Sequence, residues 1–266
     1  MSAKANILDQ IVQKKLSEVA VQKMKQPIYQ VMSEENFKRK CYSAKESITK
    51  AGASGVIAEF KRQSPSKGVI NGTATPNEVV GKYQQAGASM VSVLTDESFF
   101  GAKAEDFDTA RKTLQIPLLR KEFIVDPYQI YQSKAMGADV ILLIAAILTP
   151  QRCMDFAFLA KELGMEVLLE LHDESELEHV NKFVDLVGIN NRNLKTFVVD
   201  TDKSIQLASK LPEDMIRVAE SGLSNSGIVK EMRDKGFQAF LMGEYFMKQE
   251  SPGDACKELI REISNK

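Results

Sequence analysis

The sequence is poor in the residues that build disulfide frameworks and metal sites. Its three cysteines, Cys41, Cys153 and Cys256, lie far apart and form no Cys-x-x-Cys pair. Isolated cysteines are typical of free thiols in a reducing compartment, so we expect a cytoplasmic protein rather than a secreted disulfide scaffold. The two histidines, His172 and His179, belong to no cluster with metal-ligand spacing, and the sequence therefore predicts no metal site.

The chain also lacks a strong net charge and a long apolar run. Its formal net charge is −1 and its basic residues are spread along the chain, so we expect no nucleic-acid partner and no attraction to an anionic membrane. The longest apolar run, residues 140–148, is too short to span a bilayer. The first residues, MSAKANILDQIVQKK, lack the apolar centre of a signal peptide. These absences favour a cytoplasmic enzyme or binding protein.

What the sequence does contain is a regular alternation of apolar strands and helices from Val56 onward. The strands are rich in Val, Ile and Leu with little alternation, which is typical of parallel strands covered on both faces. They are predicted at 56–60, 90–94, 117–120, 140–144, 166–171, 184–189, 216–219 and 239–242. Helices are predicted at 76–85, 104–114, 128–136, 150–163, 174–181, 202–211, 226–235 and 254–263.

About eight such units predict a closed (β/α)8 barrel, a TIM barrel, because this fold occupies about 250 residues. The chain has 266 residues and 44% hydrophobic content, which suits one large domain over 1–266. The alternative is a doubly wound open sheet. That fold would carry a GxGxxG turn after its first strand if it bound a dinucleotide, and the sequence has none.

Residues 1–54 precede the first strand and form a predicted N-terminal helical extension. Apolar residues recur at helical spacing over 5–25 until Pro27, and a second helix is predicted over 37–50. The extension is either a short linker domain or a lid packed on the barrel. No shift in composition marks a separate domain.

Charged residues gather at the C-terminal ends of the predicted strands, where barrel enzymes hold their active sites. A period of two places Glu59 and Lys61 on the same side of the first strand. Lys121 follows the third strand, and Glu170 ends the fifth. A single charged residue at the end of a strand is usually exposed to solvent. Several inward-facing charged residues at the same end of a closed barrel share a small space. Their pKa values are then pushed apart, as acid/base catalysis requires.

Two further patterns extend this candidate site. Ser221-Gly222 follows the seventh strand and Gly243-Glu244 the eighth, at the loops where barrels often bind phosphate, and Ser64 can add a hydroxyl. His172 lies two residues after Glu170 and can face the same way, although it lies in a loop. Neither a GxSxG motif nor a Ser/His/Asp order is present.

Taken together, the motifs resemble those of the indole-3-glycerol phosphate synthase family of tryptophan biosynthesis. The resembling segments, in the family's order, are IAEFKRQSPSKG, VLTDESFFGA, LLRKEFIVDPYQIYQSKAMGADVILLIAAIL, LLELHDESEL, VGINNRNL and VAESGL. The resemblance implies a TIM barrel with a helical extension over its mouth, and no metal or cofactor. It implies a carboxy-lyase that converts 1-(2-carboxyphenylamino)-1-deoxyribulose 5-phosphate to indole-3-glycerol phosphate by decarboxylating ring closure and dehydration, through general acid/base catalysis.

The resemblance also implies roles for individual residues. Lys121 matches the general acid of ring closure, Glu59 and Glu170 match carboxylates assigned to proton transfer, and Lys61 matches the lysine beside them. The residues that match substrate-holding positions are Asn190, Arg192, Glu220 and Ser221. Those that match the phosphate end are Ser64, Gly222 and Gly243, with Glu244 beside them. Tyr245 departs from the family pattern, since a serine is usual there, and leaves only backbone donors on that side.

An apolar pocket for the aryl ring is predicted from Phe99, Phe100, Phe123, Leu142 and Leu194, and Arg192 is predicted to pair with the substrate carboxylate. Three other readings stay open on the residues alone. They are a Schiff-base aldolase using Lys61 or Lys121, a phosphosugar isomerase, and a non-catalytic phosphate-binding protein. The expected partner is a phosphorylated small molecule, and either a monomer or a homodimer is compatible with the sequence.

Overall fold

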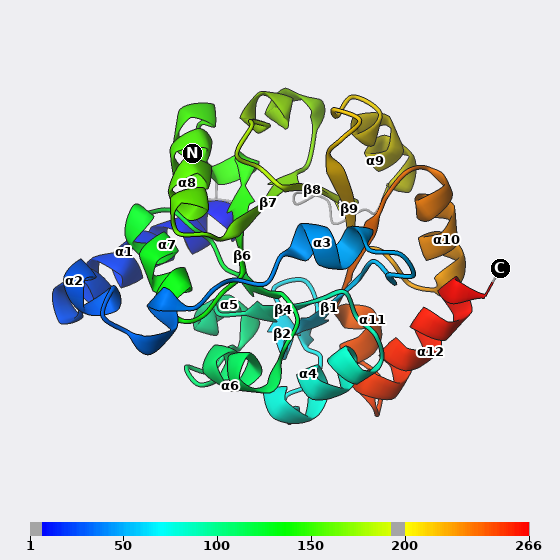
Figure 1. The fold of residues 1–266 in the computed structure, drawn as a ribbon, viewed down its shortest axis with the longest axis horizontal. Coiled ribbons are helices and arrows are strands. Elements are labelled where there is room, and N and C mark those ends of the chain that lie inside the picture. Colours follow the sequence, from blue (N-terminus) through cyan, green and yellow to red (C-terminus); the bar gives the residue numbers. More distant parts are fainter. Residues whose placement is uncertain (1–6, 193–199, 266) are drawn as a thin grey trace, which may run out of the picture.

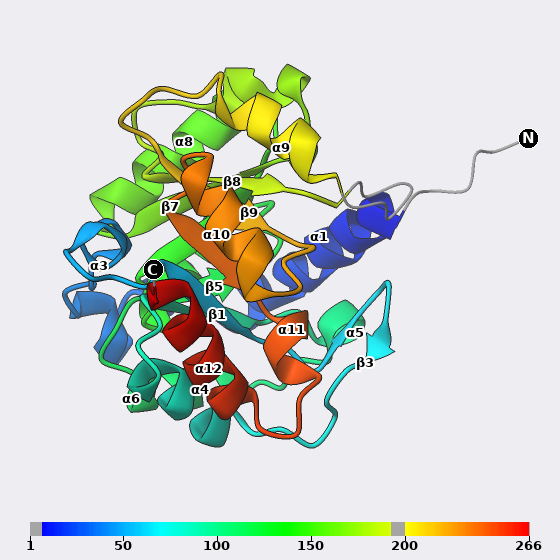
Figure 2. The ribbon, with the colours of Figure 1, turned by 90° about the vertical axis from the view of Figure 1, so that its right-hand side faces the viewer.

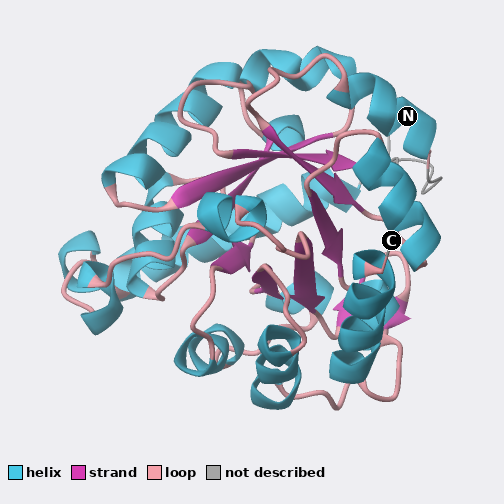
Figure 3. Cartoon of the chain, turned by 45° about the vertical axis from the view of Figure 1, so that its right-hand side comes forward, coloured by secondary structure: helices cyan, strands magenta, loops and turns pink. Residues whose placement is uncertain are grey.

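The architecture is a closed barrel of eight parallel strands surrounded by helices (Figures 1 and 3). The computed structural model describes residues 7–192 and 200–265. The barrel strands are β1 (Val56–Phe60), β4 (Met90–Leu94), β5 (Leu118–Lys121), β6 (Val140–Ile144), β7 (Glu166–Leu171), β8 (Leu186–Asn190), β9 (Ile216–Glu220) and β10 (Ala239–Met242). They are joined in the order β1-β10-β9-β8-β7-β6-β5-β4, with β1 also paired to β4. The predicted barrel is confirmed, and the open doubly wound sheet is wrong.

The barrel is filled from inside and covered from outside by alternate residues of each strand. Ile57 and Met90 belong to the inner layer of side chains, whereas Val56, Ala58 and Val91 pack against the surrounding helices. Every residue of β1 is buried, as expected for a parallel strand with both faces covered. The register places Ala58 beside Met242, so all eight strands present their C-terminal ends on one face.

The outer helices are α4 (Pro76–Gln85), α6 (Asp106–Thr113), α7 (Pro127–Ala135), α8 (Pro150–Glu162), α9 (Thr201–Ala208), α10 (Ser226–Asp234) and α12 (Pro252–Ser264). Capping residues set where several of them begin. The side chain of Asp126, for example, accepts a hydrogen bond from Tyr128 N at 2.9 Å, and Gln129 Oε1 accepts one from Asp126 N at 3.1 Å. Pro127 occupies the first turn, where no backbone donor is required.

Short elements occupy the loops at the C-terminal face. They are the hairpin β2 (Gln63–Ser64) and β3 (Gly68–Val69), the short helices α5 (Glu97–Phe100) and α11 (Glu244–Met247), and the 3-10 turns η2 (Ala145–Ile147) and η3 (Glu174–His179). The helix predicted over 174–181 is present as the 3-10 helix η3, which ends at His179. None of the helices in the described part of the chain combines the length and the apolar character needed to cross a membrane.

The N-terminal segment differs from the prediction after its first helix. It contains α1 (Ile7–Lys25), α2 (Ile28–Val31), the 3-10 helix η1 (Glu35–Lys38) and α3 (Ala44–Thr49), so the single helix predicted over 37–50 is wrong. Ser43 starts α3 by accepting a hydrogen bond from Glu46 N at 3.1 Å. Just before it, Tyr42 N donates to Asp139 Oδ1 at 2.8 Å, and this contact with the barrel holds the chain extended. A cap and a tertiary hydrogen bond thus override the helical pattern.

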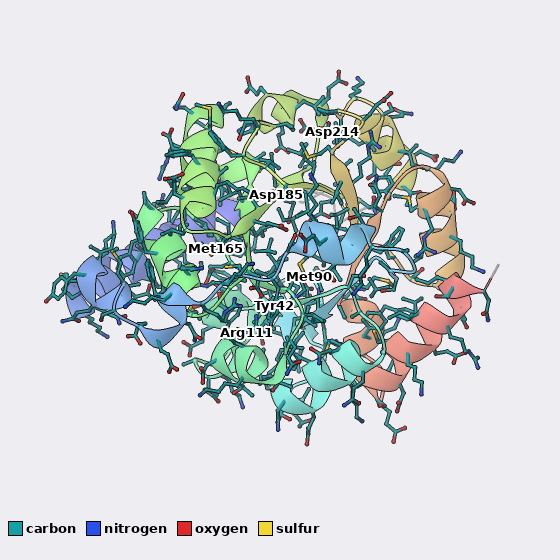
Figure 4. The ribbon with its side chains drawn as sticks, viewed as in Figure 1. Tyr42, Met90, Arg111, Met165, Asp185 and Asp214 are labelled. Carbon is teal, nitrogen blue, oxygen red and sulfur yellow. The ribbon has the colours of Figure 1, made fainter. Side chains whose placement is uncertain are left out.

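Helices α1 and α3 lie at opposite ends of the barrel (Figure 2). Ala44 and Ile48 of α3 join the inner layer with Ile57 and Met90, so α3 closes the base (Figure 4 labels Met90 below α3). The extended segment just before α3 is anchored to the barrel by Tyr42, whose ring centroid is 5.3 Å from the guanidinium carbon of Arg111 (Figure 4). Helix α1 lies at the other end, where the strands finish.

Candidate active site

A cavity of about 230 Å³ opens at the C-terminal ends of the barrel strands. The residues predicted to be catalytic, to hold the substrate or to bind phosphate all line it, namely Glu59, Lys61, Ser64, Lys121, Glu170, Asn190, Arg192, Glu220, Ser221, Gly222, Gly243 and Glu244. These residues come from β1, β5, β7, β8, β9 and the loops that follow them and β10. The barrel therefore brings charged side chains from distant parts of the chain to one place.

Lys121 lies at the centre of the charged group. Its Nζ is 2.6 Å from Glu220 Oε2 and 3.1 Å from Glu170 Oε2. Burial lowers the pKa of Lys121, but the charges of Glu220 and Glu170 raise it by more than burial lowers it. The pKa of Lys121 therefore lies above that of a free lysine. The side chain is thus held as an ammonium ion that points into the cavity.

Glu170 is oriented through both of its carboxylate oxygens. Oε2 faces Lys121, whereas Oε1 accepts a hydrogen bond from Asn190 Nδ2 at 3.0 Å. Burial raises the pKa of Glu170, but Lys121 and the donors around it bring that pKa well below the usual range. Glu170 is therefore negatively charged at neutral pH.

Glu220 has the opposite character. Burial raises its pKa to about 7, against the lowering effect of Lys121 and with the help of the nearby Glu170 charge. Its Oε1 makes no hydrogen bond to the residues that the structure describes. Room for this carboxylate comes from Gly188 of β8, where a Cβ atom would lie 1.9 Å from Glu220 Oε1.

Glu59 and Lys61 form a second charged pair on β1 and the residue just after it. Lys61 Nζ donates to Glu59 Oε1 at 2.7 Å, as the period of two predicts. Ser92 Oγ lies 3.4 Å from Glu59 Oε2. A Cβ at Gly243 would come within 2.5 Å of Glu59 Oε1, so this glycine after β10 makes space for the carboxylate.

The loop after β9 has an unusual backbone. Ser221 has a φ of 65°, the one positive value among non-glycine residues in the described ranges, and Gly222 follows with a φ of 72°. A serine in the left-handed region stores strain, which proteins often retain at functional positions. Two consecutive residues of this kind turn the chain sharply at the cavity wall, beside Gly243.

Arg192 and Glu244 meet at the outer part of the cavity. Arg192 Nη2 is 3.6 Å from Glu244 Oε2, and Arg192 Nη1 donates to Ser66 Oγ at 3.0 Å. Lys67 Nζ lies 3.9 Å from the other Glu244 oxygen. Glu244 therefore balances cations here, and its carboxylate cannot donate a hydrogen bond to a phosphate.

One wall of the cavity is apolar. Phe100, Phe123 and Leu142 line it as predicted, with the rings of Phe100 and Phe123 6.0 Å apart between centroids. Phe99 is not among the described lining residues, and Leu194 lies outside the described residues. Helix α1 of the N-terminal extension also lines the cavity, through its apolar residues Ile7, Leu8 and Ile11, which the sequence did not single out. Their helical spacing was visible, but nothing in it distinguishes a cavity wall from ordinary core packing.

Helix α1 is attached to the mouth by a buried cation. Lys15 Nζ lies 3.0 Å from Asp96 Oδ2 and 3.1 Å from Glu122 Oε1, and the residue is only 5% exposed. Burial lowers the pKa of Lys15, but Glu122, Glu18 and Asp96 raise it above the ordinary lysine value. Because Glu122 directly follows Lys121, this contact joins the helix to the strand that carries the central ammonium.

The charged groups do not make a metal site. Within the described ranges, no group of three or more His, Cys, Asp or Glu side chains has an arrangement that holds a metal ion. The carboxylates instead face lysines, which is the arrangement of a general acid/base site.

Comparison with known proteins agrees with this geometry. Residues 8–259 match the family model for indole-3-glycerol phosphate synthase. A Bacteroides thetaiotaomicron protein named indole-3-glycerol phosphate synthase is 46% identical over 258 residues, which are 97% of this chain and 99% of that protein. A Polaromonas protein of the same name is 42% identical over 260 residues, covering 96% of this chain and 98% of that one.

Solved structures show the fold. Thiamine phosphate pyrophosphorylase from Pyrococcus furiosus superposes with a TM-score of 0.57 at 14% identity, over 80% of this chain and 96% of that one. A chain of the tryptophan synthase complex from Pyrococcus furiosus gives 0.56 at 12% identity, over 79% and 97%. From the family match and the identity with its members, the chain belongs to the indole-3-glycerol phosphate synthase family, the carboxy-lyases of tryptophan biosynthesis.

Proposed function

We propose that the cavity binds 1-(2-carboxyphenylamino)-1-deoxyribulose 5-phosphate and that its charged residues carry the proton transfers of ring closure. One observation supports this above the others. A buried ammonium, Lys121, stands between an ionised carboxylate, Glu170, and a carboxyl that titrates near neutrality, Glu220, beside an apolar wall.

The first step is ring closure. The aryl carbon that carries the carboxylate attacks the ketone carbon, and the ketone oxygen gains negative charge. Lys121 donates a proton to this oxygen and becomes a neutral amine. Its raised pKa suits the task, because the proton stays on nitrogen until a strongly basic alkoxide develops. The C–C bond to the carboxylate then breaks, carbon dioxide leaves, and the electron pair restores the aromatic ring.

The second step is dehydration. The new hydroxyl must leave as water, which requires a proton, and the carbon beside the nitrogen must lose one. We assign the base to Glu170, because its carboxylate is ionised and lines the cavity beside Lys121. The Glu59–Lys61 pair supplies the acid, with Lys61 donating the proton and Glu59 holding the ammonium in place.

The remaining residues hold the substrate. Ser221 and Gly222, with the backbone of Gly243 and Glu244 and the hydroxyl of Ser64, form the phosphate end. Arg192 pairs with the substrate carboxylate once that anion competes with Glu244. Asn190 and Glu220 hold Glu170 and Lys121 in register with the reacting carbons. The apolar wall from α1, Phe100 and Phe123 receives the aryl ring.

A Schiff-base aldolase at Lys121 is less well supported. Schiff-base lysines attack as neutral amines and are activated by a lowered pKa. The pKa of Lys121 is raised instead, because two carboxylates contact the ammonium.

All proposed site residues come from one chain, so one copy is sufficient for activity in a monomer or a homodimer. We place the reaction in the cytoplasm, which the free cysteines support.

The test is to mix the purified protein with the carboxyphenylamino-deoxyribulose phosphate and follow indole fluorescence. Stoichiometric release of carbon dioxide is the expected companion signal. Trapping of a covalent adduct by borohydride, without indole formation, would instead identify the aldolase.

A further inference from the structure

His172 is a buried titratable group that the mechanism above does not use. It lies just after β7, two residues beyond Glu170, and its side chain is 11% exposed. Its Nε2 is 3.1 Å from Glu170 Oε1, and its Nδ1 is 3.7 Å from Glu176 Oε2 in η3. We propose that His172 is a positioning residue that keeps the Glu170 carboxylate oriented and negatively charged, and that Glu176 holds the His172 ring in place. This inference rests on the proposed role of Glu170 as the base.

The arrangement is a line of alternating charges. Glu170 has Lys121 at one oxygen, and His172 with Asn190 at the other. Behind the ring, Glu176 Oε2 also accepts a hydrogen bond from His172 N at 2.5 Å, which fixes the carboxylate against the loop. Neither ring nitrogen makes an aligned hydrogen bond to the described residues, so the ring is held by charge rather than by hydrogen-bond geometry.

The reaction gives a reason for a second cation. When Lys121 donates its proton during ring closure, it becomes neutral and no longer stabilises the Glu170 anion. His172 does not line the cavity and transfers no proton to substrate, so its charge persists through this step. Glu170 then remains a competent base for the dehydration that follows.

The surrounding charges support a protonated ring. Burial lowers the pKa of His172, but Glu170 and Glu176 raise it to about 10. Asp173, its neighbour in sequence, adds a further negative charge nearby. The groups that face Glu170 from the other elements are Lys121 of β5, Asn190 of β8 and Glu220 of β9.

The second histidine offers a matched control. His179 is also buried, but its ring nitrogens lie 3.0 Å from Glu176 O and 2.9 Å from Leu148 O, both backbone oxygens. Replacing His179 therefore disturbs packing and backbone contacts in the same region without removing a charge that faces Glu170.

The first measurement is ring NMR of the whole protein, in which a His172→Asn variant assigns the two histidine signals. We expect the His172 ring to stay protonated through pH 8 and to titrate near 10. In Glu176→Gln, which keeps an acceptor for His172 N, the midpoint should fall by about one unit. A His172 ring that titrates near 6.5 in the intact protein overturns the proposal.

The second measurement is the pH profile of kcat/KM. The acid limb set by protonation of Glu170 lies at low pH in the intact protein, because the pKa of Glu170 is well below the usual range. In His172→Asn this limb should move up by about one pH unit, because Glu170 loses a nearby cation. At a pH below the acid limbs of both proteins, this shift makes kcat/KM of His172→Asn about tenfold lower than that of wild type. At higher pH the two values of kcat/KM should converge. Glu176→Gln should move the limb in the same direction by less, and it serves if His172→Asn does not fold. His179→Asn should lower thermal stability and leave the limb in place.

The outcomes separate the two proposals. Normal activity of Glu170→Gln would show that Glu170 is not the base, and the proposed function of the site would fail at that step. Loss of activity in Glu170→Gln, together with an unmoved limb in folded His172→Asn, would overturn the role of His172 alone.

Discussion

Lys121 Nζ lies 2.6 Å from Glu220 Oε2 in the interior of the cavity. Replacing Lys121 with alanine should lower kcat by about 10²–10⁴ while leaving KM and the fold largely unchanged. Glu220 can take up a proton when its cation is gone, because its pKa is already about 7. Indole formation slowed by this factor, with a normal circular dichroism spectrum, is the expected result. Lys112→Ala on the surface of α6 is the control, and an unchanged kcat in Lys121→Ala would contradict the assignment.

Gly188→Ala should act through Glu220. The added methyl carbon would lie 1.9 Å from Glu220 Oε1, so the carboxylate must move and its contact with Lys121 must lengthen. We expect a lower kcat, in the same direction as a Glu220 variant, measured with the indole assay. At Gly72 the nearest atom to a new Cβ is 3.4 Å away, so Gly72→Ala should behave as wild type. Full activity in Gly188→Ala would show that Glu220 needs no fixed position.

Lys15→Met should loosen α1 from the mouth. It leaves Asp96 buried without its cation, and Glu122 with only Arg120 at 3.8 Å, which lowers the free energy of unfolding by about 3–5 kcal/mol. KM should rise because Ile7, Leu8 and Ile11 of the same helix line the cavity. Lys14 is exposed and pairs only loosely with Glu18 at 3.9 Å, so Lys14→Met should change stability by less than about 0.5 kcal/mol. Urea unfolding and steady-state kinetics on both variants test this, and equal effects would refute it.

The stability contribution of His172 should depend on pH. Its pKa is raised from 6.5 to about 10 in the folded protein, so the folded state binds the proton more tightly than the unfolded state. This contribution is complete below pH 6.5 and is lost as the pH rises through about 10. The gap in unfolding free energy between wild type and His172→Asn should therefore shrink over that range. Urea titrations at several pH values measure it, and a gap that stays constant or widens would argue against a charged His172.

Inorganic phosphate should inhibit the enzyme competitively with substrate. The loops after β9 and β10 present Ser221, Gly222 and Gly243 at the cavity, which suits a phosphate group. Gly222 has a φ of 72°, so Gly222→Ala strains this loop and should weaken inhibition. Inhibition constants for phosphate against both proteins provide the test. No effect of phosphate at high concentration would place the anion site elsewhere.

Much of the barrel follows from local signals. The predicted strands agree with the structure to within two residues, and α4 agrees at both ends, because Pro76 and the following apolar residues mark that helix. The residues of the candidate site could be predicted from the sequence for a related reason. An inward-pointing side chain at the C-terminal end of any barrel strand faces the same mouth, so the topology brings Glu59, Lys121 and Glu170 together.

The parts that the sequence did not predict depend on contacts between distant residues. Nothing in the local sequence around Lys15 indicates that it would meet Asp96 and Glu122, since each lies on a different element. The space that Gly188 leaves for Glu220 is likewise visible only once β8 and β9 are side by side. The break before α3 required the hydrogen bond from Tyr42 N to Asp139, which no helical pattern contains.

The pairing of the first barrel strand with the last has a consequence for synthesis of the chain. β1 carries Glu59 and is hydrogen-bonded to β10, so the ring closes only when Ala239–Met242 are in place. A ribosome-bound fragment that ends earlier has β1 with one bare edge, open to pairing with another nascent chain. Catalytic competence is therefore acquired in a single late event rather than built up as each unit emerges.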